Sequence, residues 1–455
     1  MDPLEYLAGA SDDWPLYATT LLVSLSLHWF LLLKKRSLGF FDPLFLILLG
    51  GAFGWSVVWF MYLRGDIKGI YALSFTASEL AFYGGLCVSP RLRRIIPLRT
   101  SSNEPPGVAI CIFASAALLH VIVTLTVWSI AGIPLFQASR LGAFVGSGGL
   151  GIFERLVDST GMIGLFAALY LVMGNARTRR RFAYYCFFLW YAIATGLSGS
   201  KSALLVIGQG VFAVTFLYTS LSQSKDSFWG GRAGRVFIAL ATGFAVLVLI
   251  TQQDLDITTA LSALAFRMVS FGDIYIYAYP DARIEILRGD NALIGMFGGF
   301  LSTFRIFPAD LVHVNLGYQL SLLTYPDLAY IAGPNPRHAV FGYHYFGPFA
   351  FMFSFVLGLL TSHLQYLLYF RKRKDFLRTL LAFLLYSAIV SVSVDFDYSL
   401  SRLANVIIAL GLILPLAYFL FPCHNTFQYI RPRFGGTRRR PFETLEISKS
   451  HGNPT

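Results

Sequence analysis

The chain is divided into long apolar blocks, and this division constrains its fold more than any other feature. The blocks run for roughly 17–25 residues, the length that crosses the hydrocarbon core of a bilayer as an α-helix. Of the 455 residues, 56% are hydrophobic and 13% are charged, whereas a soluble domain is usually about one quarter charged. Strand-like alternation over such lengths is absent, which argues against a β-barrel. The sequence therefore predicts an all-α, polytopic integral membrane protein.

Eleven of these blocks are expected to be transmembrane helices. They cover approximately residues 14–33, 41–63, 69–88, 107–130, 160–174, 182–198, 202–220, 236–252, 348–370, 379–394 and 403–421. Two substantial loops remain on one side, at about 131–159 and 253–347. The second loop mixes apolar and polar residues, so we expect it to form short helices that fold back onto the membrane surface. A loop of this length is usually functional.

The distribution of charge predicts the orientation of the chain. Of the 36 Lys and Arg residues, 25 lie in short clusters on one side of the predicted spans, together with six acidic residues. The other side has 11 basic and 17 acidic residues. By the positive-inside rule the basic side is cytoplasmic. We therefore expect residues 1–455 to form a single transmembrane domain with an external N-terminus and a basic cytoplasmic tail at 422–455.

The same reasoning excludes several other classes of function. The net charge of +12 would suggest nucleic acid binding in a soluble protein, but here it is explained by topology, and we expect no nucleic acid partner. The four cysteines do not pair at the spacing of metal ligands, so no structural zinc is expected. We find no nucleophile elbow, dinucleotide fingerprint or Asp-x-Asp motif, so chemistry with ATP or nucleotide sugars is unsupported. No cofactor and no metal are predicted.

Basic residues on the predicted outer side are the main candidates for a binding site, because topology does not require them there. They are Arg64, Lys68, Arg140, Arg155, Lys201, Arg267, Arg283, Arg288, Arg305, Arg337 and Arg402. Arg283 and Arg288 have acidic neighbours in sequence and are interpreted as solvated loop charges, since exposed ion pairs contribute little.

Five arginines lie at the membrane edge or among apolar and aromatic neighbours, where a guanidinium needs an anion. They are Arg140, Arg267, Arg305, Arg337 and Arg402. Planar guanidinium groups bind phosphate oxygens in pairs, so several of them converging on the outer face would suit a lipid phosphate or pyrophosphate. For Arg402 a structural salt bridge with Asp395 or Asp397 is an equal alternative.

The end of the large loop is rich in histidine, glycine and aromatic residues. His338 and His344, beside Arg337, are six residues apart and have the chemistry of a base and a hydrogen-bond donor. Anchoring at the membrane interface is the alternative interpretation for both. Glu79 lies within a predicted span, where a carboxylate is a functional candidate, although a hydrogen-bonded structural role is equally compatible with its position.

The order of these features resembles the O-antigen and oligosaccharide repeat-unit polymerase family (Wzy-type), including the polymerase of enterobacterial common antigen. The similarity is carried by Ile-Pro-Leu-Phe followed by Arg140, by Gly-Leu-Ser-Gly-Ser-Lys-Ser between two spans, by Phe-Arg267-Met-Val-Ser-Phe-Gly-Asp, by Phe-Arg-Ile-Phe-Pro308, by the Gly/His/aromatic end of the large loop, and by Asp-Tyr-Ser-Leu-Ser-Arg402. It covers most of the chain as loose patterns. Where that family often has an arginine after its glycines, this chain has Lys201, which lacks bidentate geometry.

The resemblance implies a metal-independent, inverting membrane glycosyltransferase of the GT-C type, in the bacterial inner membrane with a periplasmic active face. It would join undecaprenyl-pyrophosphate-linked repeat units, with membrane lipids around it; a chain-length regulator is left open as a further partner. Arg140 and Arg267 would bind the donor pyrophosphate, with Arg305, Arg337, Arg402 and Lys201 in support. His338 or His344 would act as a base or as an orienting donor, and Arg267 would assist catalysis.

Two alternatives remain open. The related ligase, which moves the finished glycan onto lipid A–core, would share many spans, a large external loop, arginines and a histidine. A flippase or other transporter would have short loops on both sides, inverted repeats and charges along a path through the membrane. The concentration of polar residues on one face and in one loop favours an enzyme over a transporter.

Overall fold

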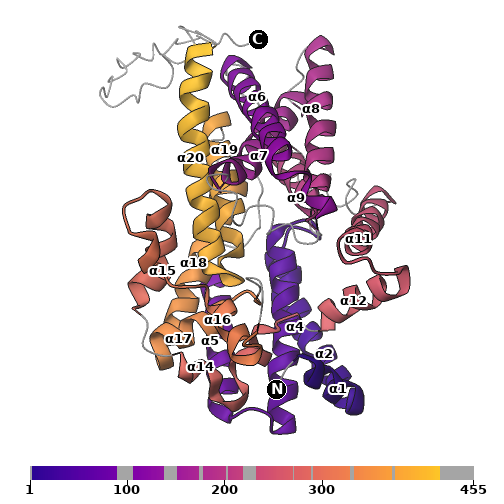
Figure 1. Cartoon of the computed structure of the whole chain (residues 1–455), viewed down its shortest axis with the longest axis vertical. Helices are drawn as coiled ribbons and strands as arrows, with labels where there is room; N and C mark the ends of the chain where they lie inside the picture. The colour runs from indigo at the N-terminus through magenta and orange to yellow at the C-terminus, as the bar shows by residue number, and fades with distance from the viewer. Residues whose placement is uncertain are drawn as a thin grey trace, which may run out of the picture.

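The protein is described by a computed structural model that covers residues 3–89, 106–137, 151–173, 178–200, 203–218, 232–269, 271–287, 291–327, 333–370 and 375–420. Within these ranges every regular element is a helix. The predicted all-α class is therefore confirmed. The helices form an elongated bundle, and α1 (Pro3–Asp12) lies at the end of the long axis opposite to the C-terminal end of α20 (Phe396–Leu420) (Figure 1).

Seven of the described helical segments are long and apolar enough to cross a membrane. They are Trp14–Arg36, Pro43–Arg64, Gly107–Phe136, Gly151–Met173, His338–Tyr369, Phe376–Ser393 and Phe396–Leu420. In the element labels of Figure 1 they comprise α2 (Trp14–His28), η1 (Trp29–Leu33) and α3 (Lys34–Arg36); α4 (Pro43–Arg64); α6 (Pro106–Ala131) and η2 (Pro134–Phe136); α7 (Gly151–Met173); α17 (His338–Phe346), η5 (Gly347–Phe349) and α18 (Ala350–Tyr369); α19 (Phe376–Ile389) and η6 (Val390–Ser393); and α20. The protein is therefore polytopic by the length and composition of its helices.

The remaining four predicted spans are also helical, but they are shorter or more polar. They are α5 (Gly69–Val88), α8 (Thr178–Leu197), α9 (Ala203–Tyr218) and α11 (Arg232–Gln253). The sequence of α5 contains Glu79, three arginines lie in the first turn of α8, and α9 has only 16 residues. Counting α11 and the helix after it as one bent span raises the total from seven to eight, so the eleven predicted crossings are matched by helices but not established as crossings.

Among the described helices, α5 and α18 pack most closely, and two glycines permit it. A Cβ atom added at Gly85 would overlap the Phe355 carbonyl oxygen, and one added at Gly358 would overlap the Phe82 carbonyl oxygen. The hydroxyl of Ser362 donates to the Leu86 carbonyl across the same interface at 2.9 Å. Small residues allow this close approach of backbones inside a membrane, where apolar burial alone does not drive helices together.

The segment predicted to be a large external loop forms short helices. They are α12 (Ile257–Val269), α13 (Ile274–Ala278), η3 (Pro280–Ala282), α14 (Arg283–Ile286), α15 (Ala292–Thr303), η4 (Ala309–Leu311), α16 (Leu316–Thr324) and α17. Most of them lie at the same end of the molecule as α1 (Figure 1). Their buried aromatic residues pack on the ends of α4 and α5, as where Tyr279 stacks on Tyr71 with 5.3 Å between ring centroids. The loop is therefore a compact cap on one end of the bundle.

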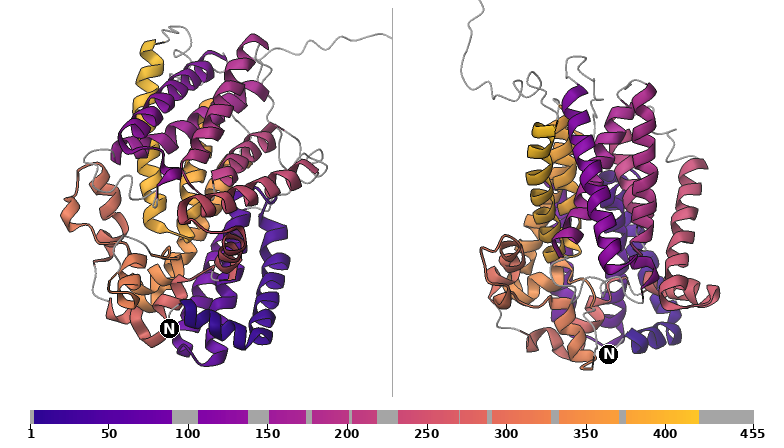
Figure 2. Two further views of the ribbon diagram at one scale, coloured as in Figure 1. Left: turned by 45° about the vertical axis from the view of Figure 1, so that its right-hand side comes forward. Right: turned by 45° about the horizontal axis from the view of Figure 1, so that its top comes forward.

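The helices α11 and α12 lie at the edge of the bundle (Figure 2). The axis of the chain turns by 117° between α11 and α12, and α12 extends crosswise to the bundle (Figure 2). Asp256 supports the turn because it accepts a hydrogen bond from the Thr259 amide at 2.6 Å.

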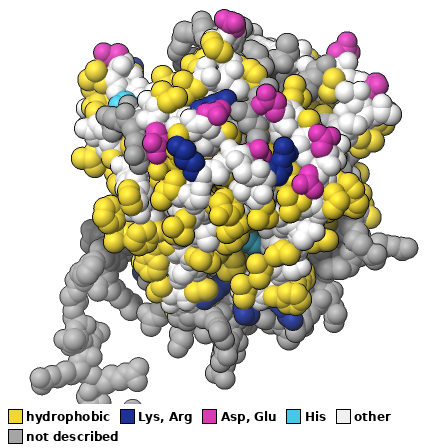
Figure 3. Space-filling model, turned by 90° about the horizontal axis from the view of Figure 1, so that it is seen from below, with side chains coloured by type: hydrophobic (Ala, Val, Ile, Leu, Met, Phe, Trp, Pro, Cys, Tyr) yellow, Lys and Arg dark blue, Asp and Glu magenta, His cyan; other side chains and the backbone are white. Residues whose placement is uncertain are grey.

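Seen from the end that holds the cap, the surface has acidic side chains among a few basic ones and many apolar ones (Figure 3), which matches the acid-rich side predicted from the sequence.

Candidate functional site

A buried polar cluster lies where α5, α17 and α18 meet. An oxygen of Glu79 (Oε1) is 3.3 Å from Nε2 of His338, and the two side chains are 2% and 4% exposed. The other ring nitrogen of His338, Nδ1, is 2.9 Å from the hydroxyl of Ser354. The ring of Phe82 stacks on the imidazole, with 4.9 Å between centroids. An ionisable pair in such a position inside a helical bundle is a functional candidate by default.

The hydrogen bonds around His338 fix where its protons lie. Ser354 donates its hydroxyl hydrogen to the Ala350 carbonyl at 3.0 Å, so it must accept from Nδ1 of His338. The remaining nitrogen, Nε2, faces Glu79 and shares a proton with that carboxyl group. Both nitrogens are therefore engaged inside the protein, and the prediction that His338 itself takes a proton directly from a substrate does not fit this geometry.

A second branch extends from Glu79 toward α2. Tyr83, one turn along α5, interacts with the carboxyl group of Glu79, and its hydroxyl is 2.6 Å from Nε2 of His28. Nδ1 of His28 donates to the Ser24 carbonyl at 2.8 Å, because a carbonyl oxygen can only accept. Gly51 of α4 makes room for the branch, since a Cβ there would lie 3.0 Å from the Tyr83 hydroxyl.

Arg337 is the cationic member of the cluster. It precedes α17, is 6% exposed, and places its guanidinium 4.9 Å from the centroid of the Phe271 ring. The hydroxyl of Tyr275 lies beside it, and a Cβ at Gly54 would come within 3.2 Å of its Nη1. Among the described residues no carboxylate forms an ion pair with it, although the charge of Glu79 is near enough to be felt. A buried guanidinium in this state has capacity for an anion.

Two adjoining cavities border these groups. The smaller, of about 10 Å³, is lined by Glu79, Tyr83, Arg337, His338 and Ser393, among others. The larger, of about 190 Å³, lies between α4, α7, α8, α9, α19 and α20, with the Phe271 ring in its wall. Ile47 and Val394 line both cavities, so only a thin apolar wall separates them.

Arg402 is the one charged residue among those that line the larger cavity. Its guanidinium lies over the Tyr398 ring at 5.6 Å. Among the described residues no ion pair joins it to Asp395 or Asp397, and its charge is not among the influences on either carboxyl group, so the structure does not support the predicted salt-bridge alternative. Asp395 instead accepts a hydrogen bond from the Tyr398 amide at 2.9 Å at the start of α20, and burial raises the pKa of its carboxyl group to about 6.

The structure brings some of the predicted site residues together and leaves others apart. Arg337, His338 and Arg402 line the two cavities. His344 is buried in the same helix as His338, α17. Its ring lies edge-on to the ring of Tyr345, with 4.5 Å between the centroids. Arg305 has a positive φ of 58° after α15 and is exposed. Arg140 and Lys201 lie outside the described residues, as does the side chain of Arg267, whose backbone belongs to α12.

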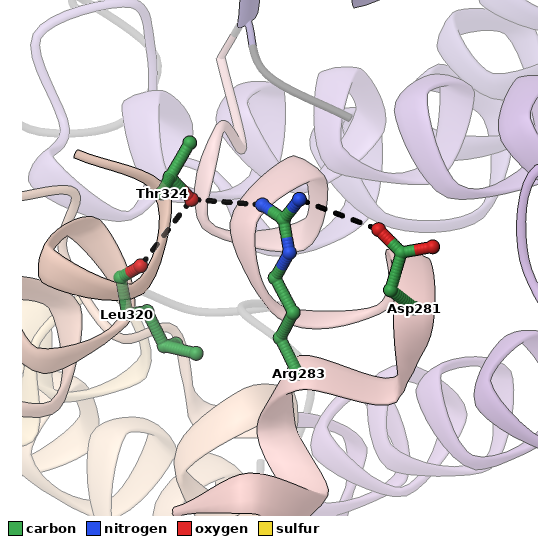
Figure 4. Close-up of polar contacts among 4 residues, drawn as sticks. All are labelled: Asp281, Arg283, Leu320 and Thr324. Carbon is green, nitrogen blue, oxygen red and sulfur yellow. Dashed lines mark hydrogen bonds and ion pairs between the residues drawn. The ribbon is translucent and has the colours of Figure 1, made fainter. Parts of the chain in front are cut away.

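Two other basic residues that were predicted to lie on the outer side, Arg283 and Arg155, have local partners, and the Arg283 side chain is only 18% exposed rather than solvated. The guanidinium of Arg283 donates to Thr324 at 2.8 Å and pairs with Asp281 at 3.3 Å (Figure 4). Thr324 in turn donates to the Leu320 carbonyl at 3.4 Å. Arg155 donates to Thr303 at 2.8 Å, which ties α7 to α15. These contacts are structural and do not border the cavities.

Sequence reasoning missed the partners that complete the cluster. Tyr275 and Phe271 come from the large loop, and His28 and Tyr83 come from two different spans. The one local signal was the pattern Gly50-Gly51-x-x-Gly54 inside a predicted span. Its glycines face Arg337, Tyr83 and Phe271, whose side chains fill the space that larger residues would occupy.

Metal binding finds no support in this arrangement: within the described ranges, no three His, Cys, Asp or Glu side chains are grouped so that they could hold a metal ion. The chain matches no protein-family model, no curated protein and no solved structure.

Proposed function

We propose that the protein polymerises undecaprenyl-pyrophosphate-linked oligosaccharide repeat units, as O-antigen or a related surface polysaccharide, at the outer face of the bacterial inner membrane. It would transfer the glycan of one lipid-linked unit to the terminal sugar hydroxyl of a second. The proposal rests on the sequence resemblance together with one structural observation. That observation is the pair of guanidinium groups, Arg337 and Arg402, at two adjoining cavities without an ion-paired carboxylate in the described chain.

Both arginines suit a pyrophosphate leaving group. As the bond between the anomeric carbon and the pyrophosphate breaks, its electron pair leaves with the pyrophosphate and negative charge grows on the phosphate oxygens. Guanidinium groups held in place before the reaction stabilise this charge, and they do so most strongly where water is excluded. Arg337 is held between Phe271, Tyr275 and the glycines of α4, so it is already oriented.

The lining of the larger cavity is compatible with part of a lipid-linked substrate. Its lining is mostly apolar, from Pro43 and Tyr369 at one end of α4 and α18 to Phe271 and Arg402. A long prenyl chain needs such surroundings, while the charged headgroup needs the arginines. Outside the cytoplasm no nucleotide sugar is present, so a donor activated by a lipid pyrophosphate is the appropriate class of substrate.

Most of the other predicted site residues keep their proposed roles. Arg140 and Arg267 would bind the donor pyrophosphate, with Arg305 and Lys201 in support. His344 is buried and lines neither cavity, so His338 is the preferred histidine of the two. His338 would act together with Glu79 rather than alone. The enzyme would be an inverting transferase of the GT-C type, as the resemblance implies.

The first experiment is a gel of surface lipopolysaccharide from a strain that lacks the gene. Core that carries a single repeat unit would support the polymerase, because export and ligation survive while polymerisation is lost. Bare core would point instead to the ligase or to a flippase, and an unchanged ladder would contradict all three. Complementation with Arg337→Ala should fail to restore the ladder, whereas Arg283→Ala, which alters an arginine paired at the surface, should restore it.

A further inference from the structure

The hydrogen-bonded chain behind Arg337 is not used by the proposed pyrophosphate site. Four side chains contact one another in the order His28, Tyr83, Glu79 and His338. At the end of this chain, the Ser354 hydroxyl accepts a hydrogen bond from His338. These residues come from α2, α5, α17 and α18. Each end of the chain terminates on a helix carbonyl oxygen. Such a continuous path of titratable groups through a helical bundle is typical of sites that take up or pass on a proton.

The number of protons in this chain shows how it responds to one more. There are five links: His28 to the Ser24 carbonyl, His28 to Tyr83, Tyr83 to Glu79, Glu79 to His338, and His338 to Ser354. In the form with no net charge, four protons are available: one on His28, one on Tyr83 and two shared by Glu79 and His338. A fifth proton fills the last link. Proton uptake therefore adds a hydrogen bond, which offsets part of the cost of a buried charge.

The smaller cavity lies between this chain and the larger cavity. Its volume of about 10 Å³ is close to that of one water molecule. Glu79, His338 and Arg337 line it together with Ser393, whose hydroxyl has no hydrogen-bond partner among the described residues. Glu79, Arg337 and Ser393 have capacity for a further hydrogen bond, and three polar groups around a space of this size are enough for a bound water. The thin wall of Ile47 and Val394 separates this space from the larger cavity.

We propose that Glu79, coupled to His338, receives the proton that the acceptor sugar hydroxyl releases during glycosyl transfer, with Tyr83 and His28 extending the group over which that proton is shared. This inference rests on the proposed polymerase function. The hydroxyl O–H bond breaks as its oxygen bonds to the anomeric carbon, and the bond to the pyrophosphate breaks with its electron pair. The proton passes through the water site to Glu79 and His338, so charge is balanced. Glu79 acts as a positioning residue because it reaches the substrate only through this relay.

Substrate binding and proton uptake should be coupled. The titratable or charged groups that face Glu79 are His28 from α2, Tyr83 from α5, Tyr275 and Tyr279 from α13 and its C-terminal end, Arg337 just before α17, and His338 from α17. Arg337 is the permanent positive charge among them, and it opposes the arrival of a proton. A bound pyrophosphate neutralises Arg337, so the chain takes up a proton more readily when the donor is present. The acceptor hydroxyl would therefore lose its proton mainly when the donor pyrophosphate is bound.

The test uses the purified full chain in liposomes with a lipid-linked repeat unit, and measures polymer formation against substrate concentration and pH. Glu79→Gln keeps the shape but cannot hold the extra proton, so we expect kcat to fall about 100-fold, as for loss of general acid–base assistance, with KM unchanged. Glu79→Asp should recover part of kcat. The rate of the wild type should fall at low pH, where the chain is already protonated, and this pH limb should be absent in Glu79→Gln. Glu285→Gln changes an exposed glutamate that also accepts from a tyrosine, Tyr343, at 3.1 Å, and should match the wild type.

The outcomes separate the relay from the proposed function. An active wild type with Glu79→Gln within about two-fold of its kcat, or with a loss confined to KM, overturns the relay and leaves the polymerase intact. A wild type that forms no polymer overturns both. If Glu79→Gln does not fold, Tyr83→Phe decides, because it removes one hydroxyl from the middle of the chain. A lowered kcat with a changed pH profile supports the relay, and an unchanged profile overturns it.

Discussion

A carboxylate oxygen of Glu79 lies 3.3 Å from Nε2 of His338, although one residue belongs to α5 near the start of the chain and the other opens α17 near its end. Glu79 and His338 stabilise the fold only when both side chains are present. Removing one partner of a buried ion pair leaves the other uncompensated and typically costs about 3–5 kcal/mol, whereas replacing both with apolar residues is often neutral.

Glu79→Leu and His338→Leu should therefore each lower the unfolding midpoint in detergent strongly, and the double variant should be more stable than the sum of the two losses predicts. The measurement is a double-mutant cycle on thermal unfolding. Leu80→Ala, at an exposed leucine beside Glu79, is the control for substitution in α5 and should have a small effect. Strictly additive losses would show that the two side chains do not interact.

The sequence was sufficient to predict the class of the fold and much of its layout. Apolar block length identified the helical ranges, and the mixed composition of residues 253–347 predicted short helices there. The number of crossings was not predictable, because α5, α8 and α9 are intermediate in length or polarity. Whether such a helix spans a membrane depends on the neighbours that shield it, and these are set by tertiary packing rather than by composition.

The sequence predicted several of the residues of the site, but not which residues contact one another there. Arg337 and His338 were identified because a guanidinium and an imidazole are costly at a membrane edge. Glu79 had no assigned partner, and Arg402 was given a local carboxylate that the structure does not pair with it. Contacts between spans such as His28 to Tyr83 depend on helix rotation and depth, which a pattern along one chain does not specify.

The crossing of α5 and α18 gives a prediction about stability. Gly358→Ala would drive a methyl group into the Phe82 carbonyl, and Gly85→Ala would drive one into the Phe355 carbonyl. Backbone atoms cannot move aside cheaply, so each variant should lose at least about 1–3 kcal/mol, as in overpacked cores. Gly411→Ala, in α20, meets nothing within 4 Å and should be neutral or slightly stabilising, because alanine favours the helix. Equal midpoints for all three variants would show that the two helices are not this close.

Asp42 should make stability depend on pH. It begins α4 and accepts hydrogen bonds from the amides of Leu38 and Leu44, from Tyr386 and from Gln365. Burial outweighs these bonds and raises the pKa of its carboxyl group from 3.8 to about 6. A raised folded-state pKa contributes stability that is present below about pH 4 and lost as the pH rises through about 6, by about 3 kcal/mol in total. Unfolding midpoints of the wild type should therefore fall over this window.

Asp42→Asn should flatten this dependence, even though it lowers stability overall because the amide nitrogen cannot accept the bonds that Asp42 receives. Asp256 provides the contrast, since hydrogen bonds from Thr259 lower the pKa of its carboxyl group. Its contribution is present at neutral pH and is lost as the pH falls, so Asp256→Asn should leave the slope between pH 4 and 6 intact. An unaltered slope in Asp42→Asn would assign the dependence to other groups, such as Asp395, whose pKa is also about 6.

The stacking of Arg337 on Phe271 gives a graded prediction for polymerisation. Arg337→Ala removes the guanidinium and should reduce the polymerisation rate by at least about 100-fold, the usual loss for a group that stabilises developing charge. Arg337→Lys keeps the charge but loses the planar fork, and should fall between Ala and wild type. Phe271→Leu removes the ring 4.9 Å from the guanidinium and should cost about 1 kcal/mol of binding, a several-fold increase in KM. The same series measured at Arg283, whose contacts are with Thr324 and Asp281, should leave the rate unchanged; if Arg283→Ala and Arg337→Ala were equally active, the pyrophosphate site would not lie at Arg337.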